Sequence, residues 1–198
     1  MLPRSPDGER SGRARVPPGQ KVTTTFYTLT AEPVPPVDTA SLRIRFWGEV
    51  AAPVEITWSE LTAPPIVTVS ADFHCVTGWS LLGTAWGGAC VADVLRKAGV
   101  KLRDSARFAM VHAVTGFTTN LPVDVLLAGD TMLVWEWNGK PLSPEHGGPL
   151  RLLVPSLYAW KSAKWVSGIE FMHDDQPGFW ESRGYHMHGD PWDEERYS

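Results

Sequence analysis

The sequence predicts a mixed α+β domain in which β structure dominates. Short segments that alternate apolar and polar residues recur along the chain, an Asn-Gly pair separates two of them, and helical spacing of apolar residues occurs in few places. The chain has 198 residues, 43% apolar and 20% charged, which is enough for one domain with a buried core. We therefore expect several strands and few helices around that core.

The first part of the chain differs in composition from the rest. Residues 1–22 hold few apolar groups and many Arg and Pro residues. Such a segment buries too little surface to offset the entropy lost on ordering. We expect a flexible N-terminal arm at residues 1–22 and the folded domain at residues 23–198.

Strands are predicted where apolar residues recur at every second position. Leu42, Ile44 and Phe46 alternate with arginine and tryptophan, the pattern of a half-buried strand. The clearest local prediction is a hairpin at Asn138-Gly139, because both residue types accept the positive φ of a type I′ turn. In chain order, strands are expected at residues 41–50, 54–58, 66–70, 106–115, 131–142, 150–155 and 163–172.

Few helices are expected, and they are short. Ser59 has a residue type that is typical of a helix N-cap. Residues 89–98 carry apolar side chains at helical spacing and stop before Gly99, a common helix end. Residues 122–127 predict a further short helix.

The C-terminal end is polar but rich in large rings. Trp180, Tyr185 and Trp192 all fall within the last 25 residues. Because unstructured tails rarely hold so many aromatic side chains, we expect this segment to wrap over the core.

Composition excludes several classes of protein. A net charge of −4 and a pI near 5.8 give no basic footprint for nucleic acid. No run approaches the roughly 20 apolar residues of a membrane span, and no apolar core of a secretory signal is visible. Two cysteines cannot make a disulfide framework, so we expect a cytoplasmic protein with reduced thiols.

The densest group of reactive residue types is Asp72–Ser80, which includes His74 and Cys75. Taken singly, a cysteine is more often a small buried apolar residue than a ligand. The sequence has no zinc-type Cys-x-x-Cys spacing, no Gly-x-Ser-x-Gly elbow and no P-loop. A cysteine protease would have to pair Cys75 with a distant His112 or His146, and no family signature supports that.

A second dense segment, residues 138–164, places basic groups among glycine and proline. It contains His146, Arg151, Lys161 and Lys164. Glycine allows close backbone approach and arginine can bind phosphate oxygens with two hydrogen bonds, so the segment suits an anionic, phosphate-bearing ligand. The alternative is a hairpin with ordinary surface charges.

Several motifs occur in a fixed order. HCVTGWS begins at His74, Trp86-Gly87 follows, and NGKPLSPEHGGPLRLLVPSLYAWKSAKW begins at Asn138. With the closing GFWESRGYHMHGDPWDEERYS, they resemble the molybdopterin-binding domain of the sulfite oxidase family. In particular the sequence resembles compact bacterial sulfite oxidase-like oxidoreductases, which are related to the catalytic subunit of methionine sulfoxide reductase. The resemblance covers residues 24–198 and implies a β-rich, mixed-sheet, barrel-like fold.

The resemblance also implies a cofactor, molybdopterin with molybdenum, and its protein ligand. The motif cysteine corresponds to Cys75, whose thiolate would bind the metal, a soft ligand suited to such a centre. His74 would have a catalytic role, either in the pocket beside this cysteine or directly behind it, and Cys90 matches no ligand position. The positions implied to bind the pterin and its phosphate are Thr24, Tyr27, Thr28, Cys75, His146, Arg151, Ser162, Ala163 and Lys164. The methionine sulfoxide reductase relatives have Asn where this chain has His146.

The function implied is that of an enzyme that transfers an oxygen atom to or from a small molecule. A sulfoxide or a related S- or N-oxide is the expected substrate. Sulfite oxidation and a non-catalytic molybdopterin-binding protein are the alternatives. The sequence offers no haem motif, no iron–sulfur cysteine set and no dinucleotide fingerprint, so we expect a separate electron-transfer partner protein. We expect it to dock at the mouth of the pocket, with residues 180–192 as part of the rim; the alternative is that these residues only cover the core.

Overall fold

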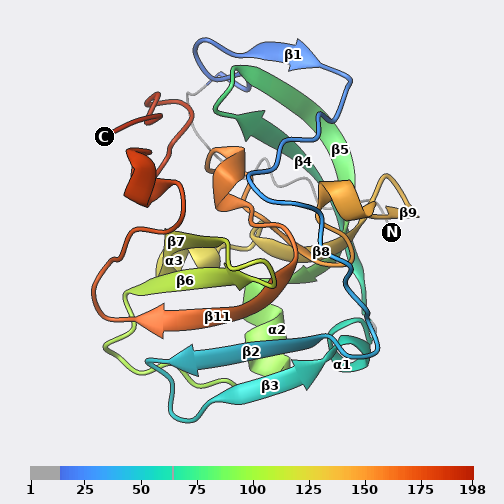
Figure 1. Ribbon diagram of the computed structural model, residues 1–198, viewed down its shortest axis with the longest axis vertical. Helices are drawn as coiled ribbons and strands as arrows, with labels where there is room; N and C mark the ends of the chain where they lie inside the picture. Colours follow the sequence, from blue (N-terminus) through green and yellow to red (C-terminus); the bar gives the residue numbers. More distant parts are fainter. Residues whose placement is uncertain (1–13, 64) are drawn as a thin grey trace.

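The computed structural model describes residues 14–63 and 65–198. Their strands form two open sheets, one above the other in Figure 1, with short helices between and around them. The prediction of an α+β fold with dominant β structure is confirmed. The barrel-like closure is not seen, because the edge strands of each sheet in the described part of the chain do not pair with each other.

The first sheet is built around one long strand. β5 pairs with β4 along one edge, with β1 at its start and with β8 at its end, and the path continues to β10. The strands of this sheet are β1 (Lys21–Thr23), β4 (Val67–Cys75), β5 (Trp79–Cys90), β8 (Met132–Trp137), β9 (Lys140–Pro141) and β10 (Arg151–Leu153). The short β1 and the length of β5 were not expected from the sequence.

The second sheet has the order β3-β2-β11-β6-β7. β11 lies parallel to β2, and the other pairs are antiparallel. Its strands are β2 (Arg43–Gly48), β3 (Val54–Thr57), β6 (Phe108–Ala113), β7 (Thr118–Pro122) and β11 (Val166–Met172). All but β7 were predicted.

The main core lies between the two sheets. Ile44 and Phe46 of β2 pack into one cluster with Leu133 of β8 and Leu152 of β10. Ile44 and Phe46 share a face of β2 because they are two residues apart in the strand. Leu133 and Leu152 share a face of the first sheet because they are paired across β8 and β10. A second apolar cluster, which includes Phe73 and Trp86, lies on the first sheet alone.

The helices are short and close to their predicted places. α1 (Trp58–Leu61), α2 (Val91–Lys97) and α3 (Val123–Leu126) follow strands directly. The predicted cap Ser59 is wrong: Thr57 is the N-cap, because its hydroxyl accepts from Glu60 N while the Glu60 carboxylate accepts from Thr57 N. Three 3-10 turns complete the elements: η1 (Pro144–His146), η2 (Ala159–Lys161) and η3 (Glu181–Arg183).

Two local predictions are confirmed. Asn138 and Gly139 connect β8 to β9 with φ values of 49° and 73°, as a type I′ turn requires. The C-terminal segment runs from the second sheet up to the first along one side of the molecule (Figure 1) and packs on both. It therefore covers the core, as its aromatic residues predicted.

Part of the expected N-terminal arm lies against the folded body. Arg15 forms an ion pair with Asp72, at 2.8 Å, and Ala14 O accepts a hydrogen bond from the Trp192 indole. Lys21 lies in β1. Residues 14–22 are therefore in contact with the domain, while residues 1–13 of the predicted arm lie outside the described residues.

Candidate functional site

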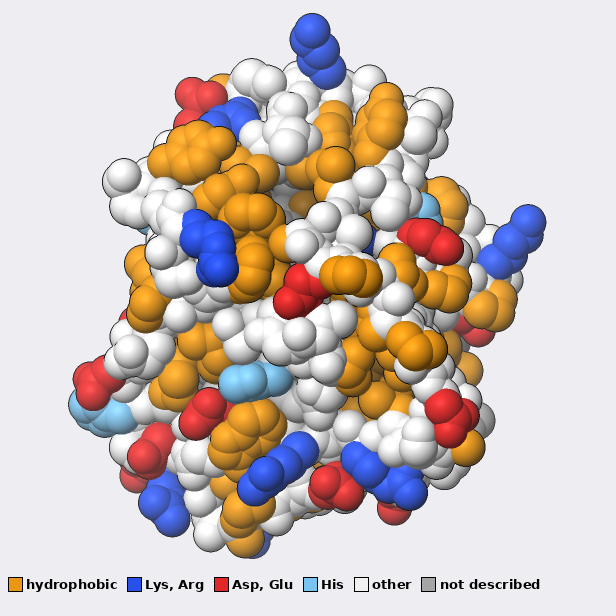
Figure 2. Space-filling view, viewed as in Figure 1, with side chains coloured by type: hydrophobic (Ala, Val, Ile, Leu, Met, Phe, Trp, Pro, Cys, Tyr) orange, Lys and Arg blue, Asp and Glu red, His pale blue; other side chains and the backbone are white. Residues whose placement is uncertain are grey.

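A cavity of about 330 Å³ opens at one edge of the first sheet. Its walls come from residues 26–32, 73–79, 146–165 and 180–185, together with Phe117. On the face shown in Figure 2, apolar side chains gather over the upper half and most charged side chains lie lower or at the edges. The cavity brings together both reactive segments that the sequence singled out, although about 70 residues separate them.

Cys75 ends β4 with its thiol at the cavity wall and only 7% of its surface exposed. Its Sγ lies 3.1 Å from the Thr77 hydroxyl. Burial raises the pKa of the Cys75 thiol, an effect that the Thr77 hydrogen bond opposes. A buried thiol keeps its proton at neutral pH unless a cation takes the place of that proton, so the position suits a metal ligand better than a free nucleophile.

Residues near both ends of the chain bind the turn that follows Cys75. The Gln20 side chain donates to Cys75 O at 3.1 Å, and Gly78 N donates to the same oxygen at 3.0 Å. Arg196 donates to Val76 O. The thiol is thus carried by a backbone that is fixed from both sides.

Arg151 is a fully buried cation at the base of the cavity, with 2% of its surface exposed. Its guanidinium donates to the backbone oxygens of His146, at 2.7 Å, and Ser162, at 3.0 Å. It lies over the rings of Phe73, Phe26 and Trp86, 5.0 to 5.9 Å from their centroids. Burial lowers the pKa of Arg151 to about 9.

Lys164 is a second cation on the same wall. Its ammonium group donates to Leu29 O at 2.9 Å and Glu145 O at 2.6 Å. Burial, and then the charge of Arg151, lower the pKa of Lys164 to about 8. Among the described residues no carboxylate lies within ion-pair distance of Arg151 or Lys164, so two neighbouring positive charges lack an anion.

Gly147 allows the backbone to pass close to both cations. Its φ is 100°, and a Cβ there would lie 2.9 Å from Lys164 Cγ and 3.1 Å from Arg151 Cβ. A larger residue would displace both basic side chains. Gly147 therefore has the role expected for close packing beside an anion site, whereas Gly148 packs against the backbone of Leu142.

His146 presents an unpartnered ring nitrogen in this cavity. Its ring stacks on Phe26, with centroids 4.0 Å apart and planes 4° apart, and its buried Nδ1 has no hydrogen-bond partner in the described part of the chain. Burial, and then Arg151 and Lys164, lower the pKa of His146. A neutral imidazole beside two cations is a hydrogen-bonding group for a ligand that the protein itself does not satisfy.

The other predicted pterin positions divide into two groups. Tyr27, Ser162 and Ala163 line the cavity. Ser162 Oγ already accepts from Val154 N at 2.9 Å, so its side chain helps to shape the wall. Thr24 and Thr28 are exposed and do not line the cavity; the segment instead turns Phe26 inward.

His74 lies behind the cavity and not in it. Phe73 and Cys75 of β4 face the cavity, while His74 points to the opposite side, as alternation along a strand requires. Its Nδ1 lies 2.8 Å from the Ser80 hydroxyl, and its ring meets the edge of Trp192. Of the two places expected for His74, the one in the pocket is therefore not the one the structure shows, and the histidine side chain lies behind the strand that carries Cys75.

Sequence reasoning missed the aromatic residues that complete the cavity. Phe26, Trp160, Trp180 and Tyr185 line it, and all four come from segments whose pattern gave no strand or helix signal. The cluster of aromatic side chains in the last 25 residues was the available signal; it indicated a part of the pocket rim or a covering segment, and named no single binding residue.

This donor set fits an anionic cofactor that carries a soft metal. Cys75 supplies a thiol, Arg151 and Lys164 supply unpaired positive charge, and His146 supplies an unsatisfied nitrogen in one aromatic-walled cavity. The family described as the oxidoreductase molybdopterin binding domain matches residues 31–180. The chain is thus an enzyme of the molybdopterin-dependent oxidoreductases, with molybdopterin carrying molybdenum as its cofactor. Within that class it belongs to the oxidoreductase molybdopterin binding domain family.

Three relatives illustrate the family. The chain is 46% identical to the uncharacterized oxidoreductase YuiH of Bacillus subtilis over 191 residues, 96% of this chain and 94% of that protein. It is 29% identical to the provisionally named protein-methionine-sulfoxide reductase subunit YedZ1 of Azospira oryzae, over 77% of this chain and 57% of that protein. It is 28% identical to sulfite oxidase of Arabidopsis thaliana, over 82% of this chain and 50% of that protein.

A solved structure shares the fold. The sulfane dehydrogenase SoxCD from Paracoccus pantotrophus aligns with a TM-score of 0.64 at 18% identity, over 76% of this chain and 42% of that chain. The sulfite oxidase type of fold is therefore confirmed. Within the described residues, no helix has the length and apolar character needed to cross a membrane.

Proposed function

We propose that this protein is an oxygen-atom-transfer enzyme that reduces a sulfoxide, or a related S- or N-oxide, at a molybdenum centre held by Cys75. The observation that carries the proposal is the placement of a buried thiol and two unpaired cations in one cavity. Either feature alone would have an ordinary structural explanation. Together they match the two ends of a cofactor with a metal at one end and a phosphate at the other.

The cations of the cavity bind the anionic end of the cofactor in this proposal. Arg151 and Lys164 would hold phosphate oxygens by charge-assisted hydrogen bonds, which are about twice as strong as neutral ones. His146, Tyr27, Ser162 and Ala163 would line the pterin. The anion would also return the lowered pKa of Lys164 toward its ordinary value, because an opposite charge favours the protonated form.

The bound cofactor supplies the redox chemistry, by which a sulfoxide gains two electrons and two protons and loses its oxygen as water. The residues of the chain bind, orient and exclude water. Cys75 fixes the metal through a backbone held from both sides, and the aromatic walls keep the reacting end dry.

A sulfoxide is favoured over sulfite by the charge of the cavity. Sulfite is an anion and needs cations at the reacting end, whereas the lining cations, Arg151 and Lys164, are both assigned to the phosphate. The remaining charged lining residue is Glu32, whose charge would repel an anion. Arg196, the cation whose charge acts on the Cys75 thiol, already donates to Val76 O and does not line the cavity. Sulfite oxidation is the second candidate, because sulfite oxidases are among the relatives.

Electrons would come from a separate partner protein at the mouth of the cavity, and the protein would act in the cytoplasm. Cys75 and Cys90 are both free thiols, as a reducing compartment maintains. We also assign the catalytic domain to residues 23–198.

The test is cofactor analysis followed by turnover. Protein made in a host that synthesises the cofactor should contain molybdenum and pterin, and should reduce sulfoxides with a reduced dye as electron donor but not with NADH or NADPH alone. Oxidation of sulfite without any reduction of sulfoxides would favour the second candidate. Full cofactor content with no turnover of either would indicate a non-catalytic binding protein.

A further inference from the structure

The cavity has two separate groups of aromatic side chains. Phe26 contacts Phe73, Trp86 and His146, and these rings surround the Arg151 charge. The second group consists of Trp160, Trp180 and Tyr185, here called the aromatic wall. In the part of the chain that the structure describes, no ring contact joins the two groups.

The rings of the aromatic wall contact one another directly. Tyr185 meets Trp160 edge-on, with centroids 5.1 Å apart and planes at 85°. It also lies against Trp180, with centroids 4.9 Å apart and planes at 33°. All three side chains line the cavity.

Cys75 lines the same cavity as both groups. It shares the cavity side of β4 with Phe73 of the first group. Trp160, Trp180 and Tyr185 of the aromatic wall line this cavity with it. A molecule that reacts near Cys75 would therefore lie within reach of the aromatic wall.

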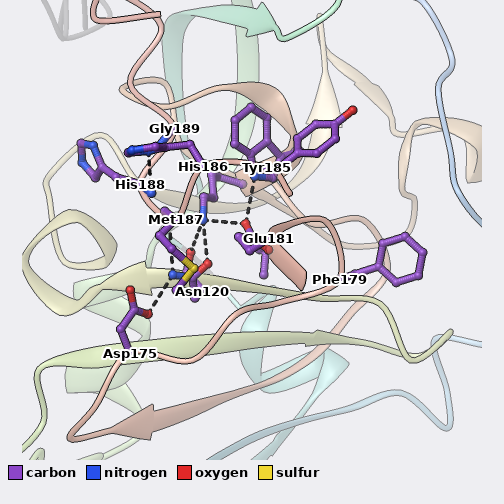
Figure 3. A network of polar contacts seen from close by, with 12 residues as sticks. Asn120, Asp175, Phe179, Glu181, Tyr185, His186, Met187, His188 and Gly189 are labelled. Atoms are coloured by element: carbon purple, nitrogen blue, oxygen red, sulfur yellow. Dashed lines mark hydrogen bonds and ion pairs between the residues drawn. The ribbon is translucent and has the colours of Figure 1, made fainter. Parts of the chain in front are cut away.

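A buried ion pair fixes the aromatic wall in place. Lys161, directly after Trp160, forms an ion pair of 2.6 Å with Glu181, directly after Trp180, and neither side chain is exposed. The Trp160 indole donates to the same carboxylate oxygen at 2.9 Å, and the Thr119 hydroxyl donates to it at 3.1 Å. Figure 3 shows Glu181 and Asn120 turned toward this centre, with Tyr185 above it.

The pair ties η2 to the C-terminal segment at the point where each contributes a ring. Lys161 Nζ also donates to Met187 O and to both oxygens of Asn120 (Figure 3). These bonds join β7, η2 and the C-terminal segment. A wall positioned by so many buried contacts is preorganised, so little entropy is lost when it binds a ligand.

We infer that the aromatic wall of Trp160, Trp180 and Tyr185 is the substrate-binding subsite, and that it selects uncharged sulfoxides with apolar or aromatic substituents. The inference rests on the proposed function and deepens it. Aromatic faces and edges bind sulfur groups and other rings favourably, and they offer an anion no compensation for its lost hydration. The specificity-determining residues are Trp180 and Tyr185, which the C-terminal segment supplies.

The test measures binding of methyl p-tolyl sulfoxide to the cofactor-loaded protein in its oxidised form, without an electron donor. Trp180→Ala and Tyr185→Ala should each raise the Kd about tenfold, as loss of an aromatic contact does. In turnover with a reduced dye, they should raise KM by a similar factor and leave kcat within about twofold. Trp47→Ala is the matched control, because Trp47 lies on β2 outside the cavity, and it should change neither value.

Two further measurements keep the outcomes distinct. If Trp180→Ala fails to fold, Trp180→Leu keeps an apolar side chain without the ring and should show the same tenfold loss. Reduction of sulfoxides by the wild type, with Kd and KM within twofold in every aromatic-wall variant, would overturn the subsite and leave the proposed function standing. Binding of the probe that depends on Trp180, with no sulfoxide reduced, would support the subsite and overturn the proposed function.

Discussion

Removal of the Glu181 charge should destabilise the protein by an amount that the structure allows us to work out. In Glu181→Gln the shape of the side chain is kept, and Lys161 remains buried without its counter-ion. Removing one partner of a buried ion pair typically lowers the free energy of unfolding by about 3–5 kcal/mol. Lys161 Nζ would retain its bonds to both Asn120 oxygens and to Met187 O, so we expect the lower end, about 3 kcal/mol.

The assay is reversible denaturant unfolding, supported by thermal melting. A loss of about 3 kcal/mol corresponds to a fall in melting temperature of roughly 6–12 °C for a chain of this size. Lys161→Met should cost more, because it leaves a buried carboxylate without its cation. The control is Asp93→Asn, which breaks an exposed ion pair with Arg96 and should cost less than about 1 kcal/mol. A loss of less than about 1 kcal/mol in Glu181→Gln would refute the view that this pair holds the C-terminal segment.

Three other predictions concern the basic side of the cavity. Arg151→Ala and Lys164→Ala should each weaken cofactor retention by about 2 kcal/mol, roughly thirtyfold, while Lys97→Ala on the outside should not; equal molybdenum content in all three would contradict this. Burial holds the pKa of Lys164 at about 8, against 10.5 in the unfolded chain. The protonated lysine therefore lowers the free energy of unfolding by its full amount below pH 8, and this destabilisation disappears as the pH rises to about 10.5. Cofactor-free wild type should thus gain stability across that range relative to Lys164→Met, and parallel pH curves would refute the effect. Gly147→Ala should lower both stability, by about 1–3 kcal/mol, and cofactor content, because its Cβ would displace Lys164; unchanged content would show that the close packing is unimportant.

The sequence was informative where local chemistry alone determines structure. The Asn138-Gly139 turn and the alternation around Ile44 were sufficient to place a hairpin and a strand. Residues 79–90 gave no such signal, because Gly83, Gly87 and Gly88 interrupt the alternation, yet β5 there is the longest strand of the described chain. Its pairing with β1, β4 and β8 stabilises it, and such tertiary pairing leaves no local pattern.

The site, like the fold, was predictable only where a local motif marks the residues. The motifs identified Cys75, Arg151 and Lys164, and all three line one cavity. The motif left open whether His74 lies in the pocket or behind it, and alternation along β4 puts it on the face opposite to Cys75, behind the cavity. The segment that holds Trp180 and Tyr185 was expected at most at the pocket rim, and neither residue was given a binding role, because only the folded chain brings their rings into the cavity lining.

The most direct test of the account is the sulfur coordination of molybdenum, measured by X-ray absorption on the wild type, Cys75→Ser and Cys90→Ser. We predict that Cys75→Ser loses one sulfur ligand and its turnover while the fold survives, and that Cys90→Ser matches the wild type in both respects. Cys90 is the suitable control because its thiol donates to Gly129 O outside the cavity. An unchanged sulfur shell with full activity in Cys75→Ser would contradict the assignment of Cys75 as the metal ligand.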